Sequence, residues 1–368
     1  MRGSKVQQVT MLGVVTPEQL IPAHHPIRRI KPLVDASLQD LEPTLEAMYA
    51  NLGRPSIPPE HLLKGCLLMA LYSIRSERQF CERLQYDLLF KWFLDLNVED
   101  PAFDHSSFAK NRDRLLRHEV ARRFFEAVLE QARRRHLLSS DHFTVDGTLL
   151  EAWASLKSFR PRDEDDGGPG AGTGGGRNPE VSWHGQPRSN ATHSSRTDPE
   201  ARLARKGNNQ PAKLYFGGHL LMENRNGLAV DVMVTEATGY AEREAGLEML
   251  GRYREGRGSG GCWTVGADKG YDVATFVDGC QELGVTPHVA QNTSNRRSAI
   301  DDATAGTPGY EVSQRVRKRV EEIMGWVKVV GGGRKLRYLG VEANQLWAEM
   351  TTTAYNLIRI GNLIAEGA

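Results

Sequence analysis

The chain is poor in cysteine, lacks long apolar runs and carries almost no net charge. Its four cysteines are scattered, with no CxxC pair and no spacing suited to zinc, which indicates reduced thiols rather than a disulfide framework or a zinc site. No apolar run approaches the roughly 18 residues of a membrane span, and the N-terminus shows no signal-peptide pattern. We therefore expect a cytoplasmic protein, and its 368 residues favour two or three domains.

The distribution of charge is more informative than the net charge of +1, which argues neither for nor against a nucleic-acid partner. Residues 105–136 hold nine Lys or Arg against four Asp or Glu, and residues 311–335 hold seven against three. A basic segment in a balanced chain is the pattern of a phosphate-binding surface. For any single segment, a solvated helix face is about as common.

Prolines recur through the first part of the chain, and we interpret residues 1–57 as an N-terminal arm with one helix. Residues 58–137 have the periodicity of an all-helical domain, whose first helix opens with prolines that a first turn tolerates. Helices are expected over four segments: Glu60–Ser73, the stretch that follows the capping-box pattern Ser76–Gln79, a segment capped by Ser106 or Ser107, and Glu119 to about His136.

From residue 138 onwards the pattern changes to alternating strands and helices. Asn224–Gly227 is a strong hairpin signal between two strand-like runs. The expected order, strand, hairpin, helix, strand, helix, strand, helix, indicates a mixed α/β layer as in ribonuclease-H-like domains. We expect strands at His142–Asp146, Lys213–Phe216, His219–Met222, Leu228–Thr235, Trp263–Asp268 and Pro287–Ala290, and helices at Ala241–Tyr253, Val273–Leu283 and Ser313 to about Val330.

Residues 158–212 interrupt this pattern. Gly167–Gly176 contains seven glycines in ten residues, and acidic residues, Ser, Asn and Pro surround it. Such a composition cannot bury enough apolar surface to order itself. We expect an insertion that is mobile unless a partner orders it.

Three acidic residues fall at positions that the expected sheet would bring together. Asp146 lies on the first strand, Asp268 at the end of the fourth, and Glu321 on the last helix, which packs beside those strands in this topology. Mg²⁺ prefers oxygen ligands, and two or three carboxylates suffice when a substrate phosphate supplies the rest. Taken singly, each acid is more often a surface or turn residue, so the prediction depends on the fold that assembles them.

The last helix supports a site of this kind. Arg317, Glu321 and Lys328 lie at i−4, i and i+7 and therefore share one face. The neighbouring face carries four apolar residues that would pack on the sheet: Val316, Val320, Ile323 and Val327. A surface ladder of ion pairs is the simpler interpretation of the charged face, but it does not account for the acids at the two strand positions.

Arg317-x3-Glu321-x6-Lys328 resembles the R-x3-E-x6-K signature of bacterial insertion-sequence transposases of the DDE type. Asp146-Gly-Thr resembles the first-acid strand of that family, and Asp268-Lys-Gly-Tyr271 resembles its second-acid motif. One position departs from the pattern, because Gln314 stands where a Tyr is often found and Tyr310 lies nearby. Further similar segments, in the right order, are Pro59–Arg114, His219–Gly227, Val289–Asn292 and Ala354–Leu357.

The resemblance implies a mechanism and partners. Two Mg²⁺ (or Mn²⁺) ions, about 3.5–4 Å apart, would be held by Asp146, Asp268 and Glu321. Water would cleave a phosphodiester at the end of the element, and the freed 3′-OH would then attack target DNA. We expect Arg317 and Lys328 to contact phosphate near the scissile bond. A homodimer is expected in the DNA complex, because strand transfer needs two element ends.

The helical domain is the expected reader of the terminal inverted repeats. Its third helix carries Lys110, Arg112 and Arg114 behind a turn and has the form of a helix that enters a major groove, although a plain basic surface is about as common. Related enzymes stack a flipped base on an aromatic side chain, for which Trp153, Trp183 and Trp326 are candidates.

Two alternatives stay open at this stage. A catalytically silent DNA-binding protein would keep the fold without the chemistry, and the three carboxylates weigh against it. A stand-alone metal-dependent nuclease would need the same site as a transposase, so sequence alone does not separate the two.

Overall fold

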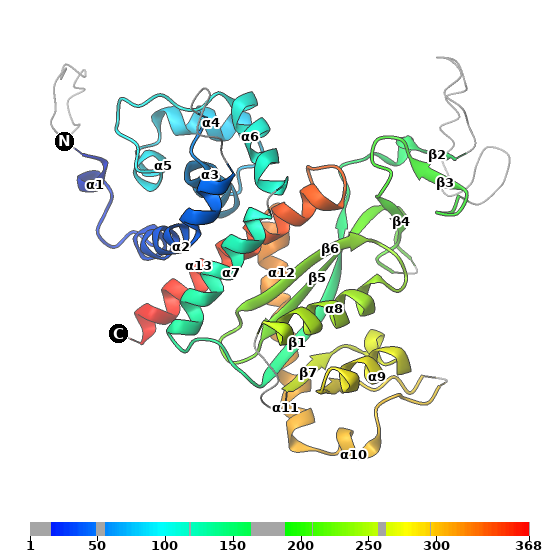
Figure 1. The fold of residues 1–368 in the computed structure, drawn as a ribbon. Coiled ribbons are helices and arrows are strands. Elements are labelled where there is room, and N and C mark those ends of the chain that lie inside the picture. Colours follow the sequence, from blue (N-terminus) through cyan, green and yellow to red (C-terminus); the bar gives the residue numbers. More distant parts are fainter. Residues whose placement is uncertain are drawn as a thin grey trace, which may run out of the picture.

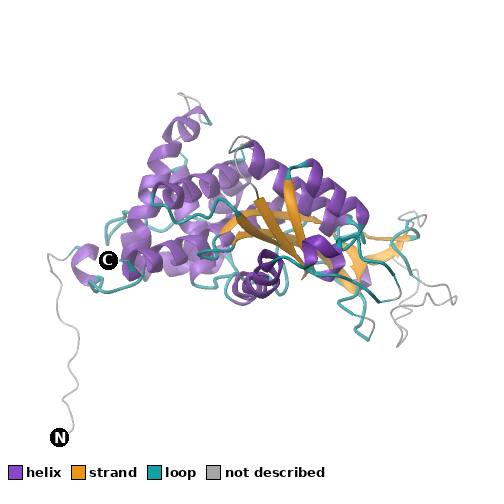
Figure 2. Cartoon of the chain, turned by 90° about the horizontal axis from the view of Figure 1, so that it is seen from below, coloured by secondary structure: helices purple, strands orange, loops and turns teal. Residues whose placement is uncertain are grey.

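The computed structural model describes residues 16–48, 56–117, 119–162, 188–207, 209–256, 263–294 and 296–367. Helices make up the first part of the chain, and a sheet with helices on both faces follows (Figures 1 and 2). None of the helices in these ranges is long and apolar enough to cross a membrane.

The N-terminal part is helical, as expected. Its helices are α1 Pro17–Leu20, α2 Ile27–Ala47, α3 Pro59–Leu71, α4 Glu77–Tyr86, α5 Leu88–Phe93, α6 His105–Arg117 and α7 Val120–Arg134. Ser76 caps α4 by accepting a hydrogen bond from the Gln79 N–H at 3.3 Å.

The expected cap of α6 is wrong. Asp104 Oδ1 accepts from the N–H groups of Ser106 and Ser107 at 3.1 and 2.9 Å. Both serines lie inside the helix, which begins at His105. A carboxylate just before the helix satisfies the first free amides and also interacts favourably with the helix dipole, so neither serine is needed as a cap.

The sheet has the mixed topology predicted for a ribonuclease-H-like core. Strand β6 pairs with β5, and the order then continues β5-β1-β7-β8, with the first two pairings antiparallel and the last two parallel. The strands are β1 His142–Glu151, β5 Lys213–Glu223, β6 Ala229–Glu236, β7 Trp263–Ala267 and β8 Val285–Val289. The hairpin expected at Asn224–Gly227 joins β5 to β6, so this fold class is confirmed.

Parts of the expected insertion are regular structure. A 3₁₀ turn, Leu156–Ser158, leads into a two-stranded ribbon of β2 Phe159–Pro161 and β3 His193–Ser195. Strand β4, Arg202–Ala204, then pairs with the first residues of β5 at one end of the main sheet. The Gly-rich run Gly167–Gly176 lies outside the described residues.

Helices cover the two faces of the sheet because alternate side chains of β1 point in opposite directions. Phe143 packs on Tyr253 of α8 (Ala241–Glu255), whereas the Thr148 hydroxyl accepts a hydrogen bond from Lys328 of α12 (Val320–Val329). The remaining helices around the sheet are α9 Ala274–Glu282, α10 Asp302–Ala305 and α11 Pro308–Val316.

The single basic helix expected from Ser313 to Val330 is broken. It consists of α11, a 3₁₀ turn at Arg317–Arg319, and α12. Ser313 Oγ is held between His142 Nε2 at 2.7 Å and His288 Nδ1 at 2.6 Å. Arg319 is held elsewhere, donating to the carbonyl oxygens of Asn224 and Arg225 at 3.1 and 3.3 Å. The two halves are thus held by different contacts, with the 3₁₀ turn between them.

The C-terminal helix α13, Val341–Glu366, joins the two parts of the molecule (Figure 1). It packs on α3 and α7 of the helical part and on β6 of the sheet. Asn356 holds it there, because its side-chain amide accepts from the Ala229 N–H at 3.0 Å and donates to the Ala229 carbonyl at 2.8 Å. Helix α2 also packs on α7. The domain boundaries at 57 and 137 stay predictions.

A buried charge cluster lies at this junction. Asp231 of β6 is 1% exposed and pairs with Arg122 of α7 and with Arg252 of α8, whose Nε is 3.2 Å from Asp231 Oδ2. Glu349 of α13 lies beside this cluster and accepts from Gln345 Nε2 at 2.9 Å. Burial raises the pKa of Glu349 to about 7.

We predict that Glu349→Gln stabilises the protein more at pH 8 than at pH 5. The folded pKa lies above the ordinary value of 4.5, so the folded state binds the proton more tightly, and the free energy of unfolding falls as pH rises through this window. The difference in free energy of unfolding between the variant and wild type should therefore be larger at pH 8 than at pH 5 by on the order of 2–3 kcal/mol. Denaturant unfolding at the two pH values measures it.

Glu342→Gln, on the exposed first turn of the same helix, is the matched control and should show no such change. A stability difference between Glu349→Gln and wild type that is the same at both pH values would contradict the prediction.

Candidate active site

Asp146 lies where β1 continues past the paired part of its neighbour. The pairing of β1 with β7 ends at Thr144 and Gly266, so Asp146 faces the open end of β7. Its Oδ1 accepts from the Gly147 N–H at 2.9 Å. The pKa of Asp146 is raised to about 7, first by burial and then by the charges of Asp268 and Glu242, while the Gly147 hydrogen bond and the Arg317 charge lower it.

Asp268 directly follows β7. Its Oδ1 accepts from the Gly270 N–H at 2.6 Å, which fixes the carboxylate at the start of the 3₁₀ turn Lys269–Tyr271. The Asp268 charge contributes to the raised pKa values of both Asp146 and Glu242. The structure therefore brings the first two predicted acids into one electrostatic group at the end of the sheet.

Glu321 lies in the first turn of α12 with its side chain exposed. Helix α12 lies beside β1, where Lys328 contacts Thr148. Arg319, just before the helix, contacts the turn after β5. The described contacts do not join Glu321 to either aspartate. Within the described ranges, no three His, Cys, Asp or Glu side chains stand close enough together to hold an ion.

The Arg317 charge lowers the pKa of Asp146, and its guanidinium is held by Gln314. Its Nε donates to Gln314 Oε1 at 2.9 Å, and Gln314 Nε2 donates to the His288 carbonyl at 2.6 Å. The nearby Tyr310 is engaged elsewhere, because its hydroxyl donates to the Val289 carbonyl at 2.9 Å. Gln314, at the position that departs from the family pattern, thus orients the arginine by hydrogen bonding.

Lys328 is the second cation near Asp146. It donates to the Thr148 hydroxyl, two residues after the aspartate on β1. Partial burial and the neighbouring charge of Lys206 lower the pKa of Lys328, and the Asp146 charge raises it. Arg317 and Lys328 therefore both act electrostatically on Asp146, and cations of this kind can contact phosphate.

Comparison with known proteins gives two family matches. Residues 15–114 match a transposase domain (DUF772), and residues 189–357 match a transposase DDE domain. The chain belongs to the DDE-type transposases. The second match includes Asp268 and Glu321, whereas Asp146 lies before its first residue.

One solved structure is similar to this transposase at a distant level. It is the cryo-EM structure of the piggyBac transposase synaptic complex with hairpin DNA, with 12% sequence identity and a TM-score of 0.42. The alignment covers 93% of this chain and 76% of that chain. A likeness this distant carries no argument about the site.

The three basic residues predicted to read DNA on α6 differ in their surroundings. Lys110 is exposed and Arg114 is half-buried. Arg112 pairs with Glu77 of α4 and stacks over the Tyr338 ring, 4.5 Å from its centroid. The guanidinium of Arg112 is therefore engaged within the transposase, where it ties α6 to α4 and to the segment before α13.

The aromatic candidates also differ. Trp153 is 53% exposed, and Lys335 Nζ lies 5.7 Å from its ring centroid. Trp326 is partly buried and packs edge-on against Tyr355 with ring centroids 5.9 Å apart. Trp183 lies outside the described residues.

Sequence reasoning missed Glu242, in the first turn of α8. Burial raises its pKa first, and the Asp268 charge raises it next. An acid in a first helical turn is ordinary, because it complements the helix dipole. No local signal in the sequence marks this residue as part of the site.

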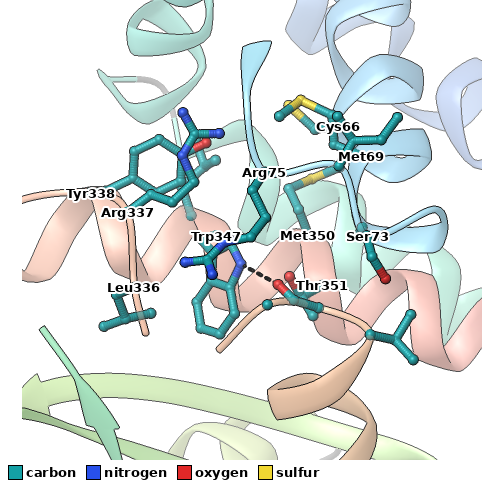
Figure 3. A pocket seen from close by; sticks show the side chains of 16 residues that line it. Cys66, Met69, Ser73, Arg75, Leu336, Arg337, Tyr338, Trp347, Met350 and Thr351 are labelled. Atoms are coloured by element: carbon teal, nitrogen blue, oxygen red, sulfur yellow. Dashed lines mark hydrogen bonds between the residues drawn. The ribbon is translucent and has the colours of Figure 1, made fainter. Parts of the chain in front are cut away.

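A pocket lies away from these acids, between α3 and the segment that joins α12 to α13 (Figure 3). Met69, Trp347 and Met350 are among its lining residues, and Trp347 Nε1 donates to the Gly331 carbonyl at 3.0 Å. Burial raises the pKa of its Cys66 thiol to about 12, so this cysteine is a poor nucleophile. The pocket is a gap in packing without acidic groups.

We predict that Arg112→Ala lowers the free energy of unfolding by about 2 kcal/mol, because it leaves the poorly exposed Glu77 carboxylate without its main partner. Lys110→Ala, two residues before Arg112 on the same helix and exposed, is the control and should change stability by less than about 0.5 kcal/mol. Equal stability of the two variants in urea unfolding would show that the ion pair is not structural.

Proposed function

We propose that this transposase binds the terminal inverted repeats of an insertion sequence, cleaves the phosphodiester at the element end, and transfers the 3′-OH end to target DNA. Asp146, Asp268 and Glu321 hold two Mg²⁺ (or Mn²⁺) ions in this proposal. The observation that carries it is the electrostatic group of Asp146 within β1 and Asp268 just after β7, with Arg317 and Lys328 acting on Asp146.

The chemistry of the aspartate pair fits a divalent cation. Burial is the main cause of the raised pKa of Asp146, and the charges of Asp268 and Glu242 add to it, so a nearby cation would favour the ionised carboxylate. Carboxylate oxygens are the ligands that Mg²⁺ prefers. When bound, the ions supply stabilisation of the negative charge that develops on the phosphodiester oxygens. Glu321 would complete the ligand set from the first turn of α12.

The basic side chains position the DNA. Arg317 presents a guanidinium whose orientation Gln314 fixes, and this geometry suits charge-assisted contact with a phosphate. Lys328 lies above β1 at Thr148 and would contact a neighbouring phosphate as a point charge. Neither contact needs a covalent bond between protein and DNA, which agrees with strand transfer by a free 3′-OH.

The helical part is the proposed reader of the element ends. Lys110 and Arg114 on α6 would contact DNA, whereas Arg112, as described above, holds the helix in place. Strand transfer joins two ends, so a homodimer is the proposed assembly on DNA. The aspartates and the basic residues favour this function over a silent DNA-binding protein.

The test of the function is Mg²⁺-dependent cleavage of a labelled duplex that carries the terminal repeat. We predict that wild type cleaves, that Glu321→Gln loses at least about 100-fold in rate because a metal-holding oxygen is lost, and that DNA binding is retained. Glu322→Gln, the adjacent exposed acid, is the matched control and should cleave like wild type.

Unchanged cleavage by Glu321→Gln would contradict the assignment of this glutamate. Tight binding of wild type to the repeat without cleavage would instead identify a silent DNA-binding protein. Cleavage without any joined product in the presence of target DNA would identify a nuclease.

We also predict that Lys328→Ala weakens DNA binding at low salt and makes the slope of log affinity against log salt concentration less negative by about 1, because one phosphate contact is lost. Lys328→Arg keeps the charge and should keep the slope. Fluorescence anisotropy across a salt series measures both values, and an unchanged slope in Lys328→Ala would place the lysine away from DNA.

A further inference from the structure

Helix α11 is held on the sheet by a hydrogen-bonded chain of three side chains. Ser313 is fully buried, and its Oγ lies 2.7 Å from His142 Nε2 and 2.6 Å from His288 Nδ1. A serine hydroxyl has one proton, so between two neutral imidazoles it donates to one and accepts from the other. Burial lowers the pKa of both histidines, which favours their neutral forms. These three residues, from β1, α11 and β8, form a His–Ser–His brace.

His288 is connected to Arg317 by a second route. Its backbone carbonyl accepts from Gln314 Nε2 at 2.6 Å, and Gln314 Oε1 accepts from Arg317 Nε at 2.9 Å. The ring of His288 thus holds Ser313, and its carbonyl holds the next residue of the helix. Because the guanidinium is a rigid plane, a hydrogen bond to Nε restricts the orientation of the whole group. One residue of β8 therefore fixes two successive residues of α11 and, through the second, the arginine.

The end of α11 lies directly on β7 beside the aspartates. An ideal Cβ placed on Gly266 would stand 3.4 Å from Arg317 Cβ and 3.5 Å from the Ser313 carbonyl oxygen. Gly266 pairs with Thr144, and each of the two aspartates follows one of these paired residues by two positions. The brace and the close contact at Gly266 therefore fix the backbone of Arg317 next to the acids.

We propose that Ser313 and His288 are positioning residues for DNA cleavage, which hold Gln314 and Arg317 so that the guanidinium meets the phosphate of the scissile strand. This inference rests on the proposed function, to which it adds two buried residues that act through Arg317. A cation that is already oriented needs no reorganisation when negative charge develops on the phosphate oxygens. Loss of the brace therefore slows cleavage by releasing the arginine.

The competing explanation is that the His–Ser–His brace only stabilises the packing of α11 on the sheet. A double-mutant cycle separates the two roles, because a residue that acts through Arg317 loses its effect once the guanidinium is gone. Arg317→Lys is the second background, since lysine keeps the charge but has no guanidinium to be oriented. His288→Asn is the conservative variant, because its amide can take the place of Nδ1 beside Ser313, whereas His288→Ala has no polar side chain.

The experiment is single-turnover cleavage of the labelled terminal-repeat duplex with Mg²⁺ and saturating full-length protein, alongside thermal unfolding of each variant. We expect Ser313→Ala to cleave at least about ten-fold more slowly than wild type, but to have little further effect in Arg317→Lys. His288→Ala should be slow, and His288→Asn should recover most of the rate. Thr307→Ala removes the N-cap of the same helix and is the matched control for stability: it should melt at a lower temperature yet cleave like wild type.

Gln314→Met gives a second measurement that leaves the buried brace intact. Gln314 is partly exposed, so this variant keeps the length of the side chain and removes only the bridge between His288 and Arg317. It should melt like wild type and cleave as slowly as Ser313→Ala. If Ser313→Ala does not fold, the rate of Gln314→Met decides the inference.

Three results would each overturn the inference: equal slowing by Ser313→Ala in both backgrounds, His288→Asn no faster than His288→Ala, or a wild-type rate in Gln314→Met. In all three cases cleavage by wild type leaves the proposed function standing. Absence of cleavage by wild type would overturn the proposed function, and the inference with it.

Discussion

The burial of Asp146 beside the charge of Asp268 is the constraint on which the site depends. The register of the sheet imposes it, because β1 continues past its last pairing with β7 and Asp268 begins where β7 ends. Burial raises the pKa of Asp146 to about 7, and the Asp268 charge contributes to the rise, so an ionised Asp146 is unfavourable at this place. A site of this kind gains most from a divalent cation, and the surrounding structure serves to hold the two acids in place.

Several contacts fix the backbone on both sides of the acids. Asp268 is held by the amide of Gly270, and Asp146 by the amide of Gly147. The α11–α12 segment lies along one face, fastened by Ser313 and Arg319, while α8 covers the other. Helix α13 packs both on the N-terminal helices and on β6 of the sheet. The part expected to read DNA is therefore packed against the part that carries the acids.

The elements that carry local periodicity could be predicted from sequence. The strand ending at Asp268, the hairpin at Asn224–Gly227 and the order of strands follow from alternation and turn chemistry, and these gave the ribonuclease-H-like fold. The closeness of Asp146 and Asp268 then follows from the parallel register, because each lies two residues beyond the last paired residues, Thr144 and Gly266. The position of Glu321 relative to them stays a prediction.

Features set by tertiary contacts could not be predicted. The break at Arg317–Arg319 depends on Arg319 reaching two carbonyl groups almost a hundred residues earlier in the chain. Arg112 has the pattern of a DNA-facing residue, yet its partners Glu77 and Tyr338 come from distant segments. Glu242 looks like any acid in a first helical turn until Gly147 and Tyr271 are placed beside it.

The most direct test of the account is a crystal structure of the wild-type protein bound to an element-end duplex and Mn²⁺, with anomalous diffraction used to locate the metal. We expect anomalous density between the carboxylates of Asp146 and Asp268, next to the DNA backbone. Density only elsewhere, or a bound duplex that leaves the two aspartates exposed to solvent with no metal between them, would contradict it.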